Sequence, residues 1–356
     1  MATARGGLLS DYAGDMQCFS GQDDCIPSIG EQIALANGGS TDVEMGVQVN
    51  SNDTSQVGAA VAAAKAADVV VLAIGIDRTI EHEGVDRVDT ALPGLQESFA
   101  DDILGLGKPT VIVLCNGGAL AIDSLIERPN AIIEAFSPSL KGAQAIAASM
   151  FGKANRWGKL PVTMYPHDYI QQQPMTNYDM AKAPGRTYKY YTGTPLFPFG
   201  HGLSLTNFSL HCDATSAPYG VAASCQVANL GQLDGDEVVM VFHNVSDAIR
   251  HKATHPIPLK ALVAFQRVSV AVGNSTSFSL PLPSSIFEVV DENGDKRLYP
   301  GSHSLIFSRG HGDTSVHTST RVQESDDGDN GEGRSAGCIG CTLRQRHTHG
   351  GSCRNN

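Results

Sequence analysis

One buried strand followed by a charged loop constrains this chain more than any other feature. Residues 68–75 form a short, mostly β-branched run without polar alternation. Such a run is typical of a parallel strand that is buried on both faces of its sheet. Residues 76–87 are abruptly polar, with Glu81 and Glu83 two positions apart and Arg87 close behind. Because open α/β sheets bind ligands beyond the carboxyl ends of their strands, this loop is the first candidate site.

Helical segments alternate with apolar strands around this feature. Ser28 followed by Glu31 forms a capping-box pattern, which predicts the start of a short helix. Further strands are expected at 110–114 and 131–135, and further helices at 95–106 and 139–151. Alternation at this spacing predicts an α/β sandwich domain, a mainly parallel sheet covered on both faces.

The pattern changes after Trp157. Residues 166–204 are rich in Pro, Gly and Tyr without a sustained period, which indicates a connector. About seven short alternating runs separated by turn residues then predict an all-β, immunoglobulin-like sandwich. The last residues carry few aliphatic side chains and are expected to form a disordered tail. The predicted division is 1–165 for the α/β domain, 166–204 for the connector, 205–309 for the β-sandwich and 310–356 for the tail.

Charge and hydropathy argue against two classes of partner. The formal net charge is −12, whereas nucleic acids and anionic membranes both attract clustered Lys and Arg. No apolar run approaches the roughly 20 residues that a membrane-spanning helix needs. Neither a nucleic acid nor a membrane is therefore expected as a partner.

Cysteines and glycosylation triplets favour an oxidising compartment for the parent protein. Cys18 and Cys25 lie close together, as do Cys212 and Cys225, and local pairs suit secreted proteins. Triplets of the Asn-x-Ser/Thr type begin at Asn52, Asn207, Asn244 and Asn274. Residues 1–10 lack the apolar core of a signal peptide, so we expect an incomplete N-terminus and an extracellular or secretory-pathway parent protein.

No metal or cofactor is expected. The sequence Asn116-Gly117-Gly118 lacks both the full glycine-rich fingerprint and the P-loop lysine of nucleotide sites. Cysteines and histidines between residues 338 and 353 include zinc-type ligands, but their spacing is not that of a standard finger.

Four distinctive segments occur in order along the chain: Ile80–Arg87, Trp157–Thr163, Pro184–Tyr191 and Leu196–Ser204. Together they resemble glycoside hydrolase family 3, and Glu-x-Glu before Asp-Arg resembles its β-xylosidase branch. The resemblance covers about Ser10 to Arg309. It implies an α/β sandwich followed by a fibronectin type III-like domain. In the family a (β/α)8 barrel precedes these domains and carries the aspartate nucleophile.

The resemblance also implies a retaining glycosidase acting on β-xylosides or xylo-oligosaccharides in xylan breakdown. Glu83 matches the general acid/base, Glu81 is the alternative, and Asp86 and Arg87 would support the loop. The chain has no barrel pattern and so no nucleophile; we expect a fragment that is inactive in isolation. The alternative is a non-catalytic, carbohydrate-associated or structural module built from the same two domains.

Overall fold

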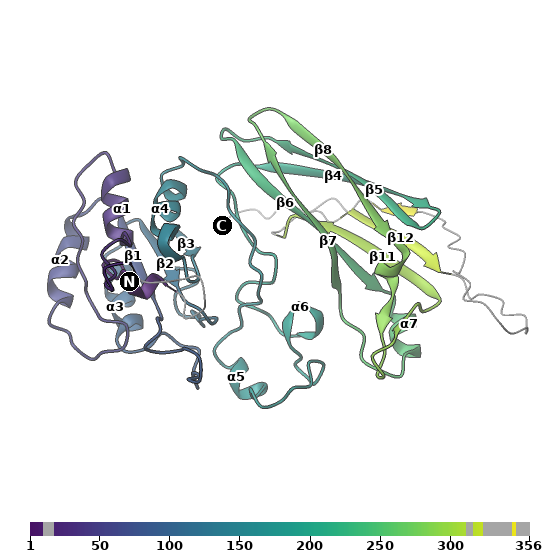
Figure 1. Ribbon diagram of the computed structural model, residues 1–356, viewed down its shortest axis with the longest axis horizontal. Helices are drawn as coiled ribbons and strands as arrows, with labels where there is room; N and C mark the ends of the chain where they lie inside the picture. The colour runs from purple at the N-terminus through teal and green to yellow at the C-terminus, as the bar shows by residue number, and fades with distance from the viewer. Residues whose placement is uncertain (10–17, 311–315, 323–343, 347–356) are drawn as a thin grey trace, which may run out of the picture. The chain divides into compact units, whose positions relative to one another are not determined.

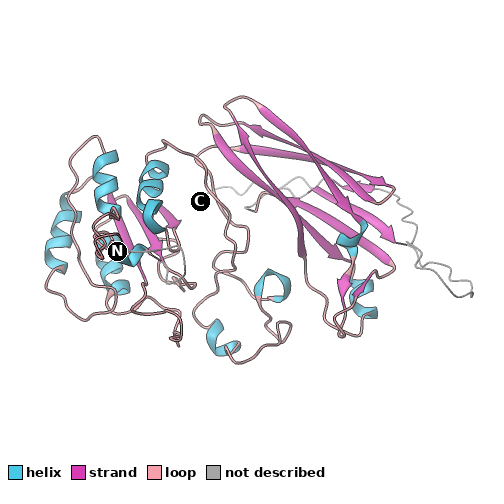
Figure 2. Cartoon of the chain, in the orientation of Figure 1, coloured by secondary structure: helices cyan, strands magenta, loops and turns pink. Residues whose placement is uncertain are grey.

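The computed structural model describes residues 1–9, 18–310, 316–322 and 344–346 (Figure 1). The chain divides into two compact units. The first unit comprises Met1–Ala154, Met164–Met175 and Thr194–Phe197, and the second comprises Asn155–Thr163, Thr176–Gly193 and the residues from Pro198 onward. Figure 2 shows helices flanking the short sheet of the first unit and long strands dominating the second.

The first unit contains an open parallel sheet with the strand order β1-β2-β3. Its strands are β1 (Val70–Gly75), β2 (Thr110–Cys115) and β3 (Ala131–Glu134). Its longer helices are α1 (Ile29–Ala36), α2 (Val57–Ala66), α3 (Gln96–Leu104) and α4 (Ser139–Met150), and a single turn, α5, spans Tyr169–Gln172. The mainly parallel α/β class predicted from the sequence is confirmed.

Side chains of β2 alternate between two apolar layers, because successive residues of a strand point to opposite faces. Val113 and Cys115 belong to a core cluster with residues of α1 and α4, including Ile29 and Ile146. Helix α1 begins as its sequence predicts: Ser28 Oγ accepts from the Glu31 N–H, and Glu31 Oε2 accepts from the Ser28 N–H. The sequence also predicts a helix around Ala121 to Ile126, which is wrong: the segment 119–130 contains turns.

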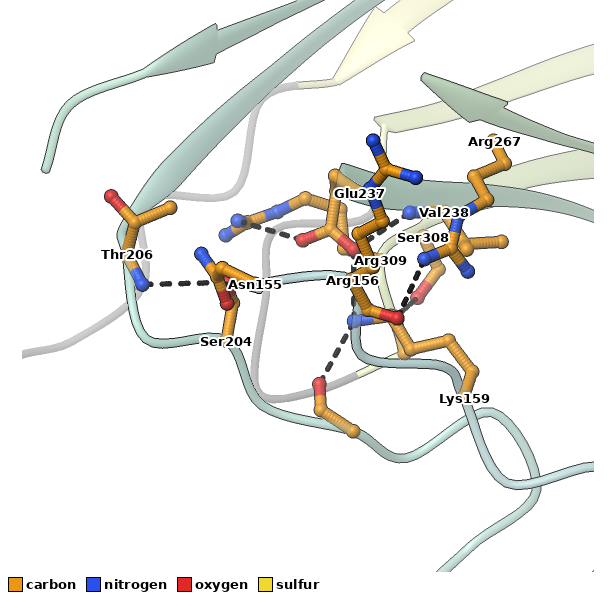
Figure 3. Close-up of polar contacts among 12 residues, drawn as sticks. Asn155, Arg156, Lys159, Ser204, Thr206, Glu237, Val238, Arg267, Ser308 and Arg309 are labelled. Carbon is orange, nitrogen blue, oxygen red and sulfur yellow. Dashed lines mark hydrogen bonds and ion pairs between the residues drawn. The ribbon is translucent and has the colours of Figure 1, made fainter. Parts of the chain in front are cut away.

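Within the second unit, residues 155–163 are held by polar contacts to residues far along the chain (Figure 3). Lys159 Nζ lies 2.9 Å from Glu237 Oε1 and donates to the Gly202 carbonyl at 2.8 Å. The Lys159 and Glu237 side chains are only 9% and 5% exposed. Asn155 Oδ1 accepts from the Ser204 hydroxyl and the Leu205 N–H, both at 3.1 Å. A buried ion pair of this kind needs such additional hydrogen bonds, because removing two charges from water is costly.

The second unit is a β-sandwich. One sheet has the order β13-β12-β11-β6-β7 and the other has the order β4-β5-β8. Phe242 and Phe307 are fully buried, and Phe307 belongs to a hydrophobic core that contains residues from both sheets. The strands are β4 (Phe208–Ala217), β5 (Gly220–Asn229), β6 (Gly235–Val245), β7 (Ala261–Val270), β8 (Ser275–Pro283), β9 (Val289–Val290), β10 (Lys296–Arg297), β11 (Gly301–Ser308), β12 (Val316–Val322) and β13 (Arg344–Arg346), with short helices α6 (Thr187–Tyr190) and α7 (Asp247–Lys252).

Strands β12 and β13 differ from the expected disordered tail. Strand β12 pairs antiparallel with β11, from Gly301 opposite Val322 to Phe307 opposite Val316. The β12 sequence, Val-His-Thr-Ser-Thr-Arg-Val, contains four β-branched residues, which suit a strand. An open sheet edge offers unpaired backbone groups, so a segment with few aliphatic side chains can still be ordered by main-chain hydrogen bonds.

Two disulfides lie within the described residues, one between Cys18 and Cys25 and one between Cys212 and Cys225. The second joins neighbouring strands β4 and β5 at directly opposed positions. Cys115 is a buried free thiol. In the described part of the chain, no helix combines the length and apolar character that a membrane span requires.

Candidate functional site

The charged loop leaves β1 at a backbone position that suits glycine. Gly75 has φ +146°, and a Cβ there would lie 1.9 Å from the Cys115 carbonyl oxygen of β2. The buried Gln96 side chain bonds both backbone groups of Gly75: Oε1 accepts from its N–H at 2.7 Å and Nε2 donates to its carbonyl at 2.7 Å. Because a buried backbone group without a partner is costly, Gln96 fixes the point at which the strand ends.

The next residues form one tight turn. Asp77 Oδ1 accepts from the Thr79 N–H at 2.9 Å and from the Thr79 hydroxyl at 2.6 Å. The Asp77 carbonyl accepts from the Ile80 N–H at 3.0 Å and from the Glu81 N–H at 3.3 Å. An aspartate that bonds the backbone two residues ahead is typical of turns. This turn sets the direction in which Glu81 leaves the loop.

Glu81 and Arg87 form a clasp against the backbone that follows β2. Glu81 Oε2 lies 2.5 Å from Arg87 Nε, and Arg87 Nη2 donates to the Ala119 carbonyl at 2.9 Å. A Cβ at Gly118 would lie 2.5 Å from Arg87 Nη2 and 2.7 Å from Glu81 Oε1, whereas one at Gly117 would have only ordinary contacts. The missing side chain at Gly118 therefore provides the space for the clasp.

Glu83 occupies the tip of a two-residue turn between the ends of the clasp. The His82 N–H donates to the Val85 carbonyl at 3.2 Å, and the Val85 N–H donates to the His82 carbonyl at 2.9 Å. Gly84, the second central residue, has φ +82°, which glycine tolerates and which type II turns require. Glu83 is exposed. The turn places Glu83 beyond the carboxyl end of β1.

The four predicted site residues differ in their burial and in their partners. Glu81 and Arg87 pair with each other, and their side chains are 32% and 11% exposed. Glu83 and Asp86 are both exposed. Among the described contacts, Arg87 pairs with Glu81 and not with its neighbour Asp86.

A fifth polar residue at the same sheet edge was missed by the sequence analysis. Glu134 ends β3, opposite Leu114 of β2, and its Oε1 accepts from the Phe136 N–H at 3.0 Å. Burial raises the pKa of Glu134 to about 7, although this N–H and the Asn116 amide lower it. The sequence contained one signal for Glu134, namely a carboxylate that ends an apolar strand. Because the carboxyl ends of neighbouring parallel strands lie at one edge of the sheet, such a residue belongs with those that follow β1 and β2.

Carboxyl groups and one guanidinium give this edge the means to transfer protons and bind polar groups. In the described residues, no group of three or more His, Cys, Asp or Glu side chains is placed to hold a metal ion. The cysteines and histidines between residues 338 and 353 lie outside the described residues.

The acidic run 291–295 is a hairpin turn in which Asp291 Oδ1 accepts from the Asn293 and Asp295 N–H groups.

Known proteins share both parts of this chain. The model of the glycosyl hydrolase family 3 C-terminal domain matches residues 10–205, and the model of a fibronectin type III-like domain matches residues 237–309. Similar curated proteins include a probable exo-1,4-β-xylosidase, bxlB, from Aspergillus fumigatus, which is 38% identical over 288 residues, 73% of this chain and 36% of the relative. The bxlB protein of Aspergillus clavatus is 35% identical over 301 residues, 77% of this chain and 38% of the relative.

Solved structures give the same result. A family 3 exo-β-xylosidase, XlnD, in complex with a xylobiose aziridine probe is 29% identical, with a TM-score of 0.76 over 86% of this chain and 42% of that chain. A β-glucosidase from Listeria innocua, 22% identical, has a TM-score of 0.75 over 90% of this chain and 45% of that chain, and shows the fold alone. The chain thus spans little more than a third of the length of the curated relatives it matches. Its two matched domains and the motifs around them show that the chain belongs to glycoside hydrolase family 3.

Proposed function

We propose that this chain supplies the general acid/base, Glu83, of a retaining glycoside hydrolase that cleaves β-xylosides. The observation that carries the proposal is the contrast between two neighbouring carboxylates. Glu81 is half-buried and pairs with Arg87 at 2.5 Å, and Glu83 is exposed at the tip of the His82–Val85 turn. A proton donor has to reach the glycosidic oxygen, and Glu83 is the more exposed of the two residues.

The clasp then has a supporting role. A two-residue turn closed by two backbone hydrogen bonds is weakly held by itself. Glu81 precedes the turn and Arg87 follows it, so their contact with each other and with the Ala119 carbonyl fixes both ends. Catalytic groups lose rate steeply when they are misplaced by about 1 Å. Glu81 and Arg87 are therefore positioning residues in this proposal.

The proposed reaction has two steps. Glu83 first gives its proton to the leaving-group oxygen while a carboxylate from outside the described residues attacks the anomeric carbon. It then takes a proton from the water that releases the sugar. Retention requires the two carboxyl groups to lie about 5 to 5.5 Å apart, which the domain supplying the nucleophile would have to satisfy.

The substrate class and the compartment are part of the same proposal. Exo-1,4-β-xylosidase relatives support terminal β-linked xylose in xylan or xylo-oligosaccharides as the substrate. The Cys18–Cys25 and Cys212–Cys225 disulfides support passage through the secretory pathway, where thiols are oxidised.

The test uses this chain fused behind the barrel of a family 3 xylosidase. Glu83→Gln is expected to lower kcat for xylobiose by about 10² to 10⁴, the usual contribution of a general acid. Bond cleavage in dinitrophenyl β-xyloside is expected to be far less affected, because that leaving group departs without a proton. Azide should restore turnover of this activated substrate and yield β-xylosyl azide.

Glu81→Gln is the matched control, because it removes the neighbouring charge and weakens the clasp. It is expected to lower activity on both substrates by a similar factor, as a positioning residue would. Selective loss on xylobiose with Glu81→Gln, together with unchanged activity of Glu83→Gln, would assign the proton transfer to Glu81 instead. The chain without a barrel is expected to show negligible turnover.

A further inference from the structure

Two asparagines that are far apart in the sequence flank one edge of the sheet β4-β5-β8. Asn207 directly precedes β4 and Asn274 directly precedes β8, and both of these strands pair with β5. The Asn207 carbonyl accepts from the Leu230 N–H at 2.7 Å, and the Asn274 carbonyl accepts from the Asn229 N–H at 3.0 Å. Because neighbouring strands are about 4.8 Å apart, the two asparagines lie about 10 Å from each other across the end of β5.

Both asparagines begin acceptor triplets for N-linked glycans, and both are exposed. The triplets are Asn207-Phe208-Ser209 and Asn274-Ser275-Thr276. Asn244, the third such residue of this unit, lies within β6 and is half-buried, and its Oδ1 accepts from Arg250 Nη2 at 2.6 Å. A glycan on Asn244 would have to displace this contact.

Exposed aliphatic side chains lie beside these asparagines: the Leu230 N–H donates to the Asn207 carbonyl, and Val272 is two residues before Asn274. Leu230 is 68% exposed and Val272 is 45% exposed. Both residues line an open depression of about 440 Å³ that Asn274 also lines. The first sugar of an N-glycan has an aliphatic face that can cover such side chains, which removes apolar surface from water.

We propose that this edge is a glycosylated face, with N-linked glycans on Asn207 and Asn274 that cover Leu230. The reaction requires a lipid pyrophosphate-linked oligosaccharide as co-substrate. The Asn Nδ2 forms a bond to C1 of the first N-acetylglucosamine and loses one proton, and the bond from C1 to the pyrophosphate oxygen breaks, releasing the lipid pyrophosphate. The modification rests on the proposed secretory route and does not involve glycosidase activity.

The test is to secrete the full chain from yeast behind a host leader peptide and to map glycosylated asparagines by mass spectrometry. Removal of the glycans by a peptide amidase in H2¹⁸O marks each modified asparagine as ¹⁸O-labelled aspartate. Label is expected at positions 207 and 274 and not at 244. Ser209→Ala and Thr276→Ala should each remove one glycan while retaining the asparagine, and Ser246→Ala is the matched control that should leave the glycan mass unchanged.

A second measurement tests the covering of Leu230. The Ser209→Ala/Thr276→Ala double variant is expected to bind a hydrophobic dye several-fold more strongly than wild type, and adding Leu230→Ser should reverse this gain. Unlabelled Asn207 and Asn274 in secreted protein, or label at Asn244, would overturn the proposal. Because the host leader supplies the route and no xyloside is assayed, these failures would leave the proposed reaction untouched.

Discussion

Glu134 offers a direct test of the electrostatics at the sheet edge. Its carboxyl group accepts from the Phe136 N–H, and burial raises its pKa from 4.5 to about 7. Glu134→Gln keeps the size and the acceptor oxygen of the side chain but removes the titration. Cys115, the nearest titratable side chain of β2, has a pKa of about 12 because it is buried, so it stays a neutral thiol throughout the experiment.

The sign of the effect follows from proton binding. Between pH 4.5 and pH 7 the folded state holds a proton on Glu134 that the unfolded state has lost. The contribution of Glu134 to the free energy of unfolding is therefore fully present below pH 4.5 and declines as the pH rises towards 7. The difference between 7 and 4.5, at about 1.4 kcal/mol per pH unit, amounts to about 3 kcal/mol. In Glu134→Gln this decline is expected to be absent.

Hydrogen exchange detected by mass spectrometry can isolate the effect within the first unit. Peptides covering β2 and β3 would be compared between wild type and Glu134→Gln at each pH, which cancels the intrinsic pH dependence of exchange. The protection of the variant relative to wild type should grow by about 3 kcal/mol from pH 4.5 to pH 7.5. A difference that stays constant with pH would refute the account of a half-buried, protonated Glu134.

Two further predictions concern other groups. Gly118→Ala should displace the clasp and speed hydrogen exchange in residues 80–87 by about tenfold relative to the control Gly117→Ala. The reason is that hydrogen bonds to charged groups contribute about 1.5 to 3 kcal/mol. Equal exchange in both variants would contradict this. In the second unit, His243 Nε2 lies 2.9 Å from His303 Nδ1, and burial lowers the pKa of His243 from 6.5 to about 3. Its neutral form is stabilising above pH 6.5, so the urea midpoint read by tryptophan fluorescence should fall from pH 7 to pH 4; a constant midpoint would exclude a buried neutral pair.

Local rules in the sequence were sufficient for the elements that frame the site. The capping box of Ser28 and Glu31 depends on residues three apart, and it forms as predicted. The apolar run before Gly75 predicts a strand, and β1 occupies it. The predicted burial on both faces is wrong: Val70, Val71 and Ala73 are only half-buried, because β1 is an outer strand of the sheet β1-β2-β3. The short alternating runs after residue 205 likewise become the antiparallel strands of the sandwich.

Contacts across the sheet could not be derived in the same way. Arg87 and Ala119 are 32 positions apart, and their contact depends on the register that places Gly75 opposite Cys115. A period-two pattern identifies a strand but not its partner residue. The burial of Glu134 depends likewise on its neighbour in β2, so a carboxylate at the end of a strand gave no indication of its pKa.

The arrangement of the loop explains why two similar carboxylates acquire different roles. A separation of two residues turns Glu81 towards the Gly118 backbone while Glu83 remains at the tip of the turn. Gly84 permits that turn, and the bare backbone at Gly118 admits the guanidinium that holds Glu81. Each glycine acts on one carboxylate: Gly84 by its positive φ, and Gly118 by the space that a Cβ would fill. Exchanging the two carboxylates in function would therefore require a different path of the backbone, and not merely a different pair of side chains.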